Sequence, residues 1–137
     1  MDLEGLREIK EIMTPIPHIA KAEDRLSVAV AVMDQHRIRH LPVIKEGEIF
    51  GILSDRDCKL ALYVAERFDI TEPLMIGEVC SQNPYIVAPK TKLEDVTLAM
   101  YERRISSALV AEDGAMLGIF TSMDACRWIG TWLRNKG

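Results

Sequence analysis

The chain has 137 residues, of which 48% are hydrophobic and 28% are charged. This length suits one ordinary domain or two small units that share a core, and the average composition excludes disordered and low-complexity proteins. The formal net charge of -4 argues against a general nucleic-acid or anionic-membrane binder, although it is compatible with a local basic pocket. No apolar run approaches the roughly 20 residues that a membrane span requires.

The cysteines also constrain the compartment. Cys58, Cys80 and Cys126 are widely separated, odd in number and form no CxxC pair. The charged N-terminus is unlike a secretory signal. We therefore expect a cytoplasmic protein with three unpaired thiols.

An internal repeat organises the chain. At a shift of 67 positions, residues 11–57 align without a gap to residues 78–124, and 12 of the 47 pairs are identical. One register held over this length indicates a tandem duplication. The predicted organisation is an N-terminal helix at 1–10, a first repeat at 11–68, a linker at 69–77 and a second repeat at 78–137.

In chain order, a helix is expected over about 3–12 and an extended stretch over 18–20. A helix over 26–36 follows, because its apolar residues recur at i, i+3, i+4 and i+7. Strands over 41–44 and 49–53 flank a Glu-Gly turn, a hairpin signal because glycine accepts a positive φ. The last helix begins after Ser54 and ends before Asp69, and 69–77 is expected to be an ordered loop.

The second repeat follows the same plan. An extended stretch is expected over 85–87, a helix over 93–103, strands over 108–111 and 116–120 around an Asp-Gly turn, and a helix after Thr121. Each repeat is therefore β-α-β-β-α, and the fold class is α/β (α+β). Because neither repeat is long enough for a good core alone, the two are expected to pack sheet against sheet with pseudo-two-fold symmetry.

Both repeats place one motif where the last strand meets the last helix. It is Gly, two apolar residues, a hydroxyl, two variable residues and an aspartate, so Ser54 precedes Asp57 and Thr121 precedes Asp124. A structural interpretation is a capping box at the helix N-terminus. A functional interpretation is a ribose site, because a carboxylate beside a hydroxyl can accept both hydrogens of a vicinal diol and a helix N-terminus favours phosphate. The local chemistry leaves both interpretations open.

The duplicated unit, together with the segments MTPIP, RHLPVI, GILSDRD and GIFTSMD, resembles a tandem CBS-domain pair over residues 11 to about 130. The resemblance implies a stand-alone, non-catalytic sensor with two clefts between the copies, which bind adenosine-containing ligands such as AMP, ADP or ATP. It implies no obligatory cofactor. The family's ribose-contacting hydroxyl and aspartate fall on Ser54 and Asp57 in the first site, and on Thr121 and Asp124 in the second.

The resemblance also suggests further ligand contacts. The phosphate candidates are Arg39, His40 and Arg56, and the base-pocket candidates are Ile19, Ala20, Ile86 and Val87. The second repeat has Ser106 and Ser107 where the first has Arg39 and His40, so phosphate contacts there would need Arg103, Arg104 or Arg56. A solvated basic turn is the structural alternative for Arg39 and His40.

The sequence leaves other functions open. One is a sensor for S-adenosylmethionine or NAD, and another is a structural dimerisation module with empty clefts. An enzyme would use Asp57, Asp124 or His40 as general acid or base, but no nucleophile, P-loop or GxGxxG motif supports it. Nucleic-acid binding is weaker still, and no histidine or cysteine spacing predicts a metal site.

The last helix carries Trp128 and Trp132, four positions apart. This spacing suits a buried helix face, or a partner surface, because tryptophan is favoured at interface centres. We expect a homodimer through this surface, and an effector protein that the sequence does not identify.

Overall fold

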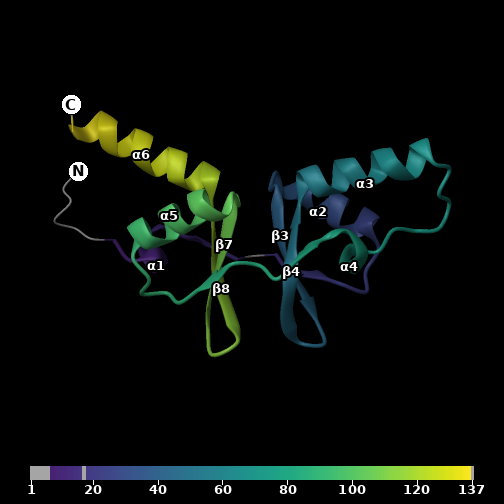
Figure 1. Ribbon diagram of the computed structural model, residues 1–137, viewed down its shortest axis with the longest axis horizontal. Helices are drawn as coiled ribbons and strands as arrows, with labels where there is room; N and C mark the ends of the chain where they lie inside the picture. Colours follow the sequence, from purple (N-terminus) through teal and green to yellow (C-terminus); the bar gives the residue numbers. More distant parts are fainter. Residues whose placement is uncertain (1–6, 17, 137) are drawn as a thin grey trace. The chain divides into compact units, whose positions relative to one another are not determined.

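The computed structural model describes residues 7–16 and 18–136, and its elements form two similar series (Figure 1). The first series is α1 (Ile9–Ile12), β1 (Thr14–Pro15), β2 (Ala20–Lys21), α2 (Leu26–His36), β3 (His40–Lys45), β4 (Glu48–Ser54) and α3 (Asp55–Arg67). The second is α4 (Ile76–Val79), β5 (Ser81–Gln82), β6 (Ile86–Val87), α5 (Leu93–Arg103), β7 (Ser107–Glu112), β8 (Ala115–Thr121) and α6 (Ser122–Lys136). The predicted helices over 26–36 and 93–103 are confirmed to the residue.

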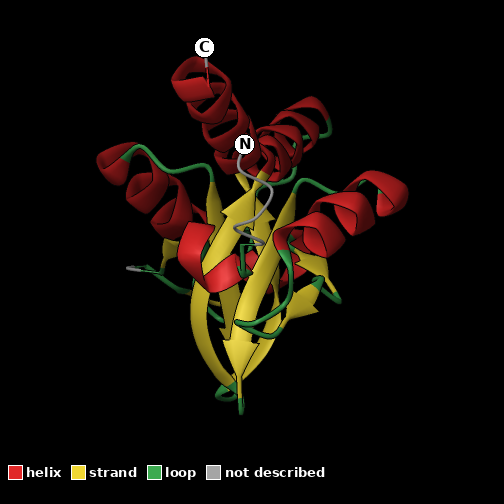
Figure 2. Ribbon diagram, turned by 90° about the vertical axis from the view of Figure 1, so that its left-hand side faces the viewer, coloured by secondary structure: helices red, strands yellow, loops and turns green. Residues whose placement is uncertain are grey.

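The strands form two four-stranded sheets, in the orders β2-β3-β4-β5 and β1-β8-β7-β6. The predicted mixed α/β fold class is therefore confirmed. Two compact units contain these sheets. We call Pro17–Pro84 the middle unit, and Met1–Ile16 together with Tyr85–Gly137 the terminal unit. Within each unit the helices lie on one side of the sheet (Figures 1 and 2).

The compact units are offset from the sequence repeats, because the first strand of each repeat joins the other repeat's sheet. β1 pairs antiparallel with β8, and β5 pairs antiparallel with β4. The repeated glycines permit this close approach: a Cβ on Gly51 would collide with the carbonyl oxygen of Ser81, and one on Gly118 with the Met13 side chain. Each sheet is therefore completed by a segment that the sequence assigns to the opposite repeat.

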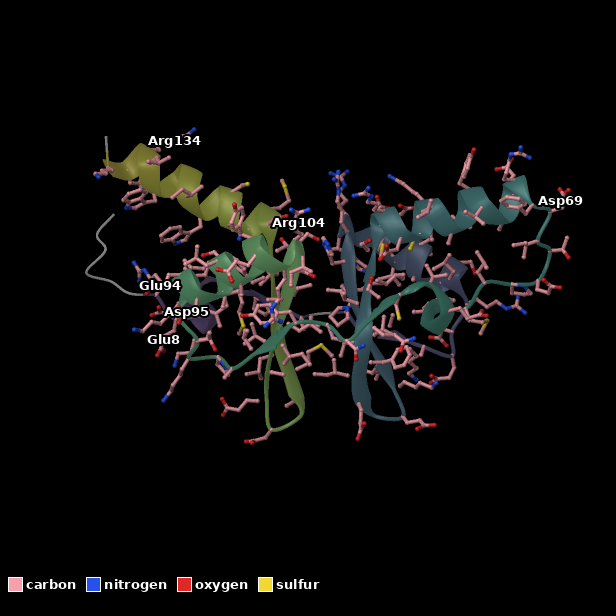
Figure 3. The ribbon with its side chains drawn as sticks, viewed as in Figure 1. Glu8, Asp69, Glu94, Asp95, Arg104 and Arg134 are labelled. Carbon is pink, nitrogen blue, oxygen red and sulfur yellow. The ribbon has the colours of Figure 1, made fainter. Side chains whose placement is uncertain are left out.

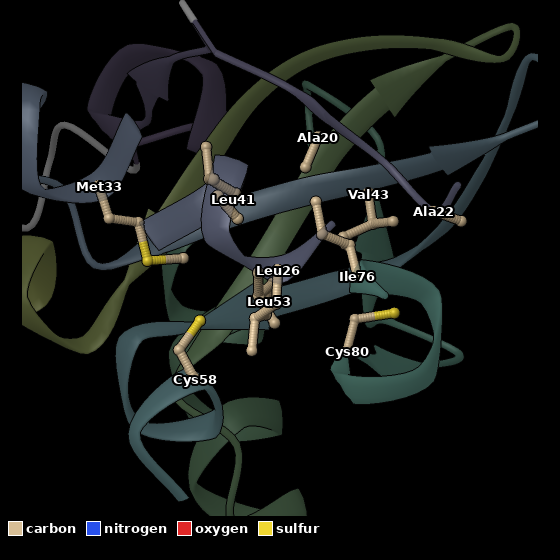
Figure 4. Close-up of a cluster of buried hydrophobic side chains, with 11 residues drawn as sticks. Ala20, Ala22, Leu26, Met33, Leu41, Val43, Leu53, Cys58, Ile76 and Cys80 are labelled. Atoms are coloured by element: carbon tan, nitrogen blue, oxygen red, sulfur yellow. The ribbon is translucent and has the colours of Figure 1, made fainter. Parts of the chain in front are cut away.

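Each unit has its own apolar core. Figure 4 shows the cluster of the middle unit, where α2, β3, β4, α3 and α4 contribute buried side chains. Its members are Ala20, Ala22, Leu26, Ala29, Met33, Leu41, Val43, Leu53, Cys58, Ile76 and Cys80. The corresponding cluster of the terminal unit consists of Ile9, Val87, Leu93, Val96, Met100, Ala108, Val110 and Phe120.

Both predicted hairpins are confirmed, with strands one residue longer at each end than expected. At the turns Glu46 and Asp113 each have φ 52°, and the following Gly47 and Gly114 have φ 78° and 80°. Two successive positive φ values match the twist of the flanking strands, which is why an acidic residue followed by glycine stands here in both repeats.

Three expectations need correction. The predicted helix over 3–12 lies partly outside the described residues, and within them it begins only at Ile9, because Glu8 is extended and bridges to Lys92. The predicted loop over 69–77 ends early, because α4 starts at Ile76. The strand expected over 18–20 is Ala20–Lys21, since parallel pairing with β3 begins at Ala20. Among the described residues, no helix combines the length and apolar character of a membrane span.

Candidate functional site

The predicted site residues of the middle unit lie at one edge of its sheet. β2 and β3 run parallel to each other, and β4 runs antiparallel to both. The N-terminal ends of β2 and β3 therefore point towards the same end of the sheet as the C-terminal end of β4. His40 pairs directly with Ser54 in this register. Ile19 precedes β2, while Arg56 and Asp57 lie in the first turn of α3. The motif thus lies at the His40 end of the sheet, whereas Ile19 precedes a strand that begins beside Val43.

Ser54 and Asp57 form a reciprocal cap on α3. The Ser54 amide donates to Asp57 Oδ2 at 3.3 Å, and the Asp57 amide donates to Ser54 Oγ at 3.0 Å. The capping-box interpretation is therefore confirmed here. Within the described residues, Asp57 Oδ1 has no hydrogen-bond partner in the protein, so half of this carboxylate is open to a ligand.

In the equivalent aspartate of the terminal unit, both carboxylate oxygens accept hydrogen bonds. Asp124 Oδ2 accepts hydrogen bonds from the Thr121 amide at 2.9 Å and from the Thr121 hydroxyl at 3.2 Å. Its Oδ1 accepts from the Thr14 hydroxyl at 3.3 Å and from Arg127 Nη2 at 3.5 Å. The same motif therefore has both carboxylate oxygens occupied in one unit and only one in the other.

The basic candidates flank the cap of the middle unit. Arg39 is exposed in the turn before β3, and its carbonyl oxygen accepts from the Asp55 amide at 2.8 Å. His40 is half-buried as the first residue of β3, and Arg56 is exposed on α3. Hydrogen-bond donors for a phosphate thus lie on both sides of Ser54.

The corresponding position of the terminal unit lacks this basic pair. Ser106 occupies the place of Arg39 and accepts from the Ser122 amide at 2.9 Å. Arg103 instead covers the Tyr85 ring, with 4.4 Å between the guanidinium carbon and the ring centroid.

The four base-pocket candidates differ in how much of each residue is exposed to solvent. Ala20 and Val87 are buried in the two cores, at 7% and 8% exposure. Ile19 and Ile86, one position earlier, are 49% and 44% exposed. Ile19 and Ile86 therefore each present an exposed apolar side chain in their own unit, whereas Ala20 and Val87 belong to the two cores.

Two open grooves lie on helix surfaces, and neither is lined by the four ribose candidates. One, of about 580 Å³, lies along the end of α5 and the start of α6, beside Arg104 (Figure 3). The other, of about 470 Å³, lies beside α2, with Leu62 and Leu74 in its lining. The first groove adjoins the second motif, because Ser122 and Ala125 line it.

The buried thiols are electrostatically linked to the motif. Burial, together with the nearby carboxylates of Asp55 and Asp57, raises the pKa of Cys58 to about 11. Burial also raises the pKa of Cys80, with a smaller contribution from Asp57. Both thiols are therefore neutral packing groups near pH 7. Across residues 7–16 and 18–136, no cluster of three or more His, Cys, Asp or Glu side chains is arranged to hold a metal ion.

Comparison with protein families decides the family. The CBS domain family model matches twice, at residues 9–64 and 76–131. The chain belongs to the CBS domain family. Both matches begin at the short helices α1 and α4, so the CBS repeat extends further towards the N-terminus than the 11–57 alignment indicated.

Two curated relatives show different contexts for such a CBS pair. The CBS domain-containing protein YhcV of Bacillus subtilis is 26% identical over 114 residues, which are 83% of this chain and 79% of YhcV. Inosine-5'-monophosphate dehydrogenase of Korarchaeum cryptofilum is 27% identical over 117 residues, which are 85% of this chain but 22% of the dehydrogenase. The chain thus spans most of one relative and about a fifth of the other.

Two solved CBS structures contain adenosine compounds. The CBS domain pair of MJ0100, in complex with 5'-methylthioadenosine and S-adenosyl-L-methionine, is 26% identical with a TM-score of 0.80, covering 92% of this chain and 98% of that one. CBSX2 in complex with AMP is 25% identical with a TM-score of 0.75, covering 95% and 98%.

Thr14 and Arg127, which both contact Asp124, were missed by reasoning from the sequence. Thr14 donates to Asp124, 110 positions away, because β1 pairs with β8. The only signal in the sequence was its repeat partner Ser81, another hydroxyl at the equivalent position. The sequence could not show that each opening segment joins the opposite sheet, so it did not indicate a contact between Thr14 and Asp124.

Proposed function

We propose that this CBS pair is a regulatory module that performs no catalytic step and binds an adenine nucleotide of the AMP, ADP or ATP class. The observation that carries the proposal is the open Oδ1 of Asp57 beside the Ser54 hydroxyl, at an edge flanked by Arg39, His40 and Arg56. The complexes of MJ0100 and CBSX2 with adenosine compounds support the ligand class.

The ribose contact follows from the donors and acceptors. A vicinal diol donates to a carboxylate oxygen, and Asp57 offers Oδ1 without breaking its bond to the Ser54 amide. The Ser54 oxygen keeps its bond from the Asp57 amide, while the hydroxyl hydrogen donates to a ribose oxygen. The ligand therefore binds to an intact helix cap.

The phosphate and the base extend this contact along the same edge. Arg39 and Arg56 are exposed and remain charged at any physiological pH, which suits a phosphate group. His40 adds a third donor next to Ser54. The exposed side chain of Ile19 provides an apolar surface for the adenine ring, with the backbone of Ala20 beside it.

We assign the terminal unit a weaker site of the same kind at Thr121 and Asp124. A diol there competes with Thr14 and Arg127 for Asp124 Oδ1. Ile86 and Val87 take the places of Ile19 and Ala20, and Arg103 or Arg104 at the end of α5 supplies a guanidinium. The middle unit is therefore expected to fill first.

Calorimetric titration with AMP and with 2'-deoxy-AMP tests the diol contact. The wild-type chain should prefer AMP, and Asp57→Asn should weaken AMP binding about tenfold or more, since a hydrogen bond to a charged group is worth about 1.5–3 kcal/mol. The variant should no longer distinguish AMP from the deoxy compound. Asp55→Asn is the matched control, because Asp55 pairs with Lys59 at 2.9 Å outside the cap. An unchanged preference in Asp57→Asn would contradict the ribose assignment.

A thermal-unfolding panel separates the alternatives. AMP, ADP, ATP, S-adenosylmethionine and NAD are added singly, and a true ligand at 100 times its Kd adds about 2.7 kcal/mol. A shift with S-adenosylmethionine or NAD alone would replace the nucleotide class proposed here. A flat panel from a dimeric protein would favour a structural module, and turnover of an added nucleotide would favour an enzyme.

We further propose a cytoplasmic homodimer that signals to an effector protein. Trp128 packs against the core of the terminal unit, and Trp132 stacks on it with ring centroids 6.4 Å apart. The apolar residues of α6 left exposed are Met123, Ile129 and Leu133, at 69%, 41% and 57%. Sedimentation should show a dimer that Leu133→Glu weakens and Arg134→Glu does not. Equal sedimentation of all three proteins as monomers would contradict it.

A further inference from the structure

The carboxylate of Asp124 has its acceptor positions filled by the protein itself. Oδ2 accepts from the amide and the hydroxyl of Thr121, at 2.9 and 3.2 Å. Oδ1 accepts from the Thr14 hydroxyl at 3.3 Å and from Arg127 Nη2 at 3.5 Å. An ionised carboxylate has about four lone-pair positions, and these bonds use them all. Because the Asp124 side chain is also only 13% exposed, a ligand hydroxyl can bind to it only by displacing one of these donors.

The two donors on Oδ1 differ in how they are held. The Arg127 side chain is 71% exposed on α6, so its guanidinium can turn into solvent. Thr14 belongs to β1, a strand of two residues that pairs with β8. The other residue, Pro15, cannot donate a backbone hydrogen bond to the ladder, so few such bonds hold β1. The bond from the Thr14 hydroxyl to Asp124 therefore contributes to the attachment of β1.

The strand register brings Thr14 to the motif. Thr14 lies opposite Ile119 of β8. Ile119 and Thr121 share one face of that strand, because alternate residues point to the same side. Thr14 is therefore a diagonal neighbour of Thr121, within reach of the helix cap that follows it.

The middle unit has the same register without the same bond. Ser81, 67 positions after Thr14, lies opposite Ile52 of β4. Across the described residues, the Ser81 hydroxyl makes no hydrogen bond to Asp57. The pairing of the short strand thus does not by itself impose a bond to the aspartate. The bond from Thr14 is a feature of the terminal unit that the shared fold does not require.

We propose that Thr14 is an internal competitor at the terminal site: a ligand diol takes its place on Asp124 Oδ1, and loss of this bond loosens β1 from β8. The inference rests on the proposed function for the ligand. Because the two bonds exclude each other, the Thr14 bond lowers ligand affinity by the same factor by which the ligand weakens the attachment of Thr14. Thr14 therefore sets how much more ligand the terminal unit needs than the middle unit, and β1 responds when the terminal site fills.

Calorimetric titration with AMP tests the competition. An Asp57→Ala background removes the carboxylate of the middle site and leaves the terminal motif intact. In this background, Thr14→Val keeps the branched shape of the side chain but removes its hydroxyl. AMP binding should become about fivefold tighter, the equivalent of one ordinary hydrogen bond. Truncation of a residue that only supports the site, or that itself contacts the ligand, would weaken binding, so unchanged or weaker binding would overturn the inference.

Two control variants locate the effect. Ser81→Ala in an Asp124→Ala background should leave AMP affinity at the middle site unchanged, because Ser81 does not compete for Asp57. In the Asp57→Ala background, Arg127→Gln should strengthen binding less than Thr14→Val does, because the exposed guanidinium is displaced more easily. If Arg127→Gln strengthens binding and Thr14→Val does not, Arg127 is the competitor and the inference is wrong.

Hydrogen-deuterium exchange followed by mass spectrometry tests the release of β1. In the Asp57→Ala background, saturating AMP should accelerate amide exchange in peptides that contain Thr14. With Thr14→Val added, the side-chain bond is already absent, so AMP should cause no further acceleration. Slower exchange in these peptides on addition of AMP would show that Thr14 and the ligand bind together, which would overturn the inference.

A measurement without ligand separates this inference from the proposed function. In urea denaturation, the double-mutant cycle of Thr14→Val with Asp124→Ala should show a coupling of about fivefold in the unfolding equilibrium constant, since the two side chains share a hydrogen bond. The cycle of Ser81→Ala with Asp57→Ala should show none. AMP that binds at neither site would contradict the proposed function and, with it, the competition. Absence of the Thr14–Asp124 coupling would overturn this inference alone, even where AMP binds.

Discussion

Ile9 and Ile76 are both fully buried and stand 67 positions apart, yet each packs into the core built mainly from the opposite repeat. Ile9, at the start of the first CBS match, lies among residues of α5, β7 and β8. Ile76, at the start of the second match, lies among residues of α2, β3 and β4. The two repeats are thus interlocked by short helices at their beginnings.

Truncation of either isoleucine should therefore be costly. Ile9→Ala is expected to lower the free energy of unfolding by about 2–5 kcal/mol, the cost of deleting a buried aliphatic group. Ile76→Ala should cost a similar amount, while Lys10→Ala, which removes an exposed ion pair to Glu8, should cost less than about 1 kcal/mol. Urea denaturation measures all three. An Ile9→Ala variant as stable as Lys10→Ala would show that α1 does not contribute to the core.

Gly51 and Gly118, where a short strand from the opposite repeat approaches closely, give a second prediction. Gly51→Ala should destabilise the protein by about 1–3 kcal/mol, because its Cβ would collide with the backbone carbonyl of Ser81. Gly118→Ala should also destabilise it, since its Cβ would lie 2.9 Å from the Thr14 carbonyl oxygen. Gly130→Ala is the matched control.

In α6 a Cβ at Gly130 meets nothing within 4 Å, so alanine there should stabilise the helix by up to about 1 kcal/mol. Differential scanning calorimetry should therefore rank Gly130→Ala above wild type and both strand variants below it. Gly51→Ala at wild-type stability would mean that β5 does not pair closely with β4.

Variants of the helix cap at Ser54 and Asp57 should affect protein stability and AMP affinity to different degrees. Ser54→Ala removes the oxygen that accepts from the Asp57 amide, and should cost about 1 kcal/mol. Asp57→Asn keeps an acceptor for the Ser54 amide at Oδ1 of the amide side chain, so it should cost less stability but more AMP affinity. Chemical denaturation and calorimetric titration of the same two variants measure both quantities. If AMP affinity falls in proportion to stability in both variants, the motif acts only as a helix cap.

The raised pKa of Cys58 predicts a stability change in alkali. Its folded value, about 11, lies above the ordinary 9.0, so the folded state holds the proton more tightly than the unfolded state. The stabilisation is complete below about pH 9 and is lost as the pH rises through about 11. It amounts to at most about 2–3 kcal/mol.

Urea denaturation between pH 8 and pH 11 measures this effect. The stability advantage of the wild-type chain over Cys58→Ala should shrink as the pH rises. Cys126→Ser is the control, because the Cys126 thiol is exposed and its removal should leave the pH profile unchanged. A constant difference between wild type and Cys58→Ala would contradict the shifted pKa.

Local features could be predicted from the sequence because their causes are local. The apolar spacing of α2 and α5 and the acidic-glycine turns each depend on neighbouring residues, and the structure confirms them. The Ser54–Asp57 cap also spans only three positions, so its existence was foreseeable. The short helix α4 was not predicted, and α1 was expected as part of a longer helix over 3–12. Four residues have little intrinsic helical stability, so these two helices depend on the burial of one isoleucine each.

The sequence by itself determined the duplication, the CBS family, and the hydroxyl-carboxylate pair at the start of each last helix. Only the tertiary structure decided that β1 and β5 join opposite sheets, that Thr14 and Arg127 occupy Asp124 Oδ1, and that Asp57 Oδ1 accepts no hydrogen bond from the described residues. The reason is physical. A periodic pattern fixes which face of a strand or helix is buried, but the partner of a two-residue strand is chosen by long-range packing, and the partner decides which polar groups surround each carboxylate.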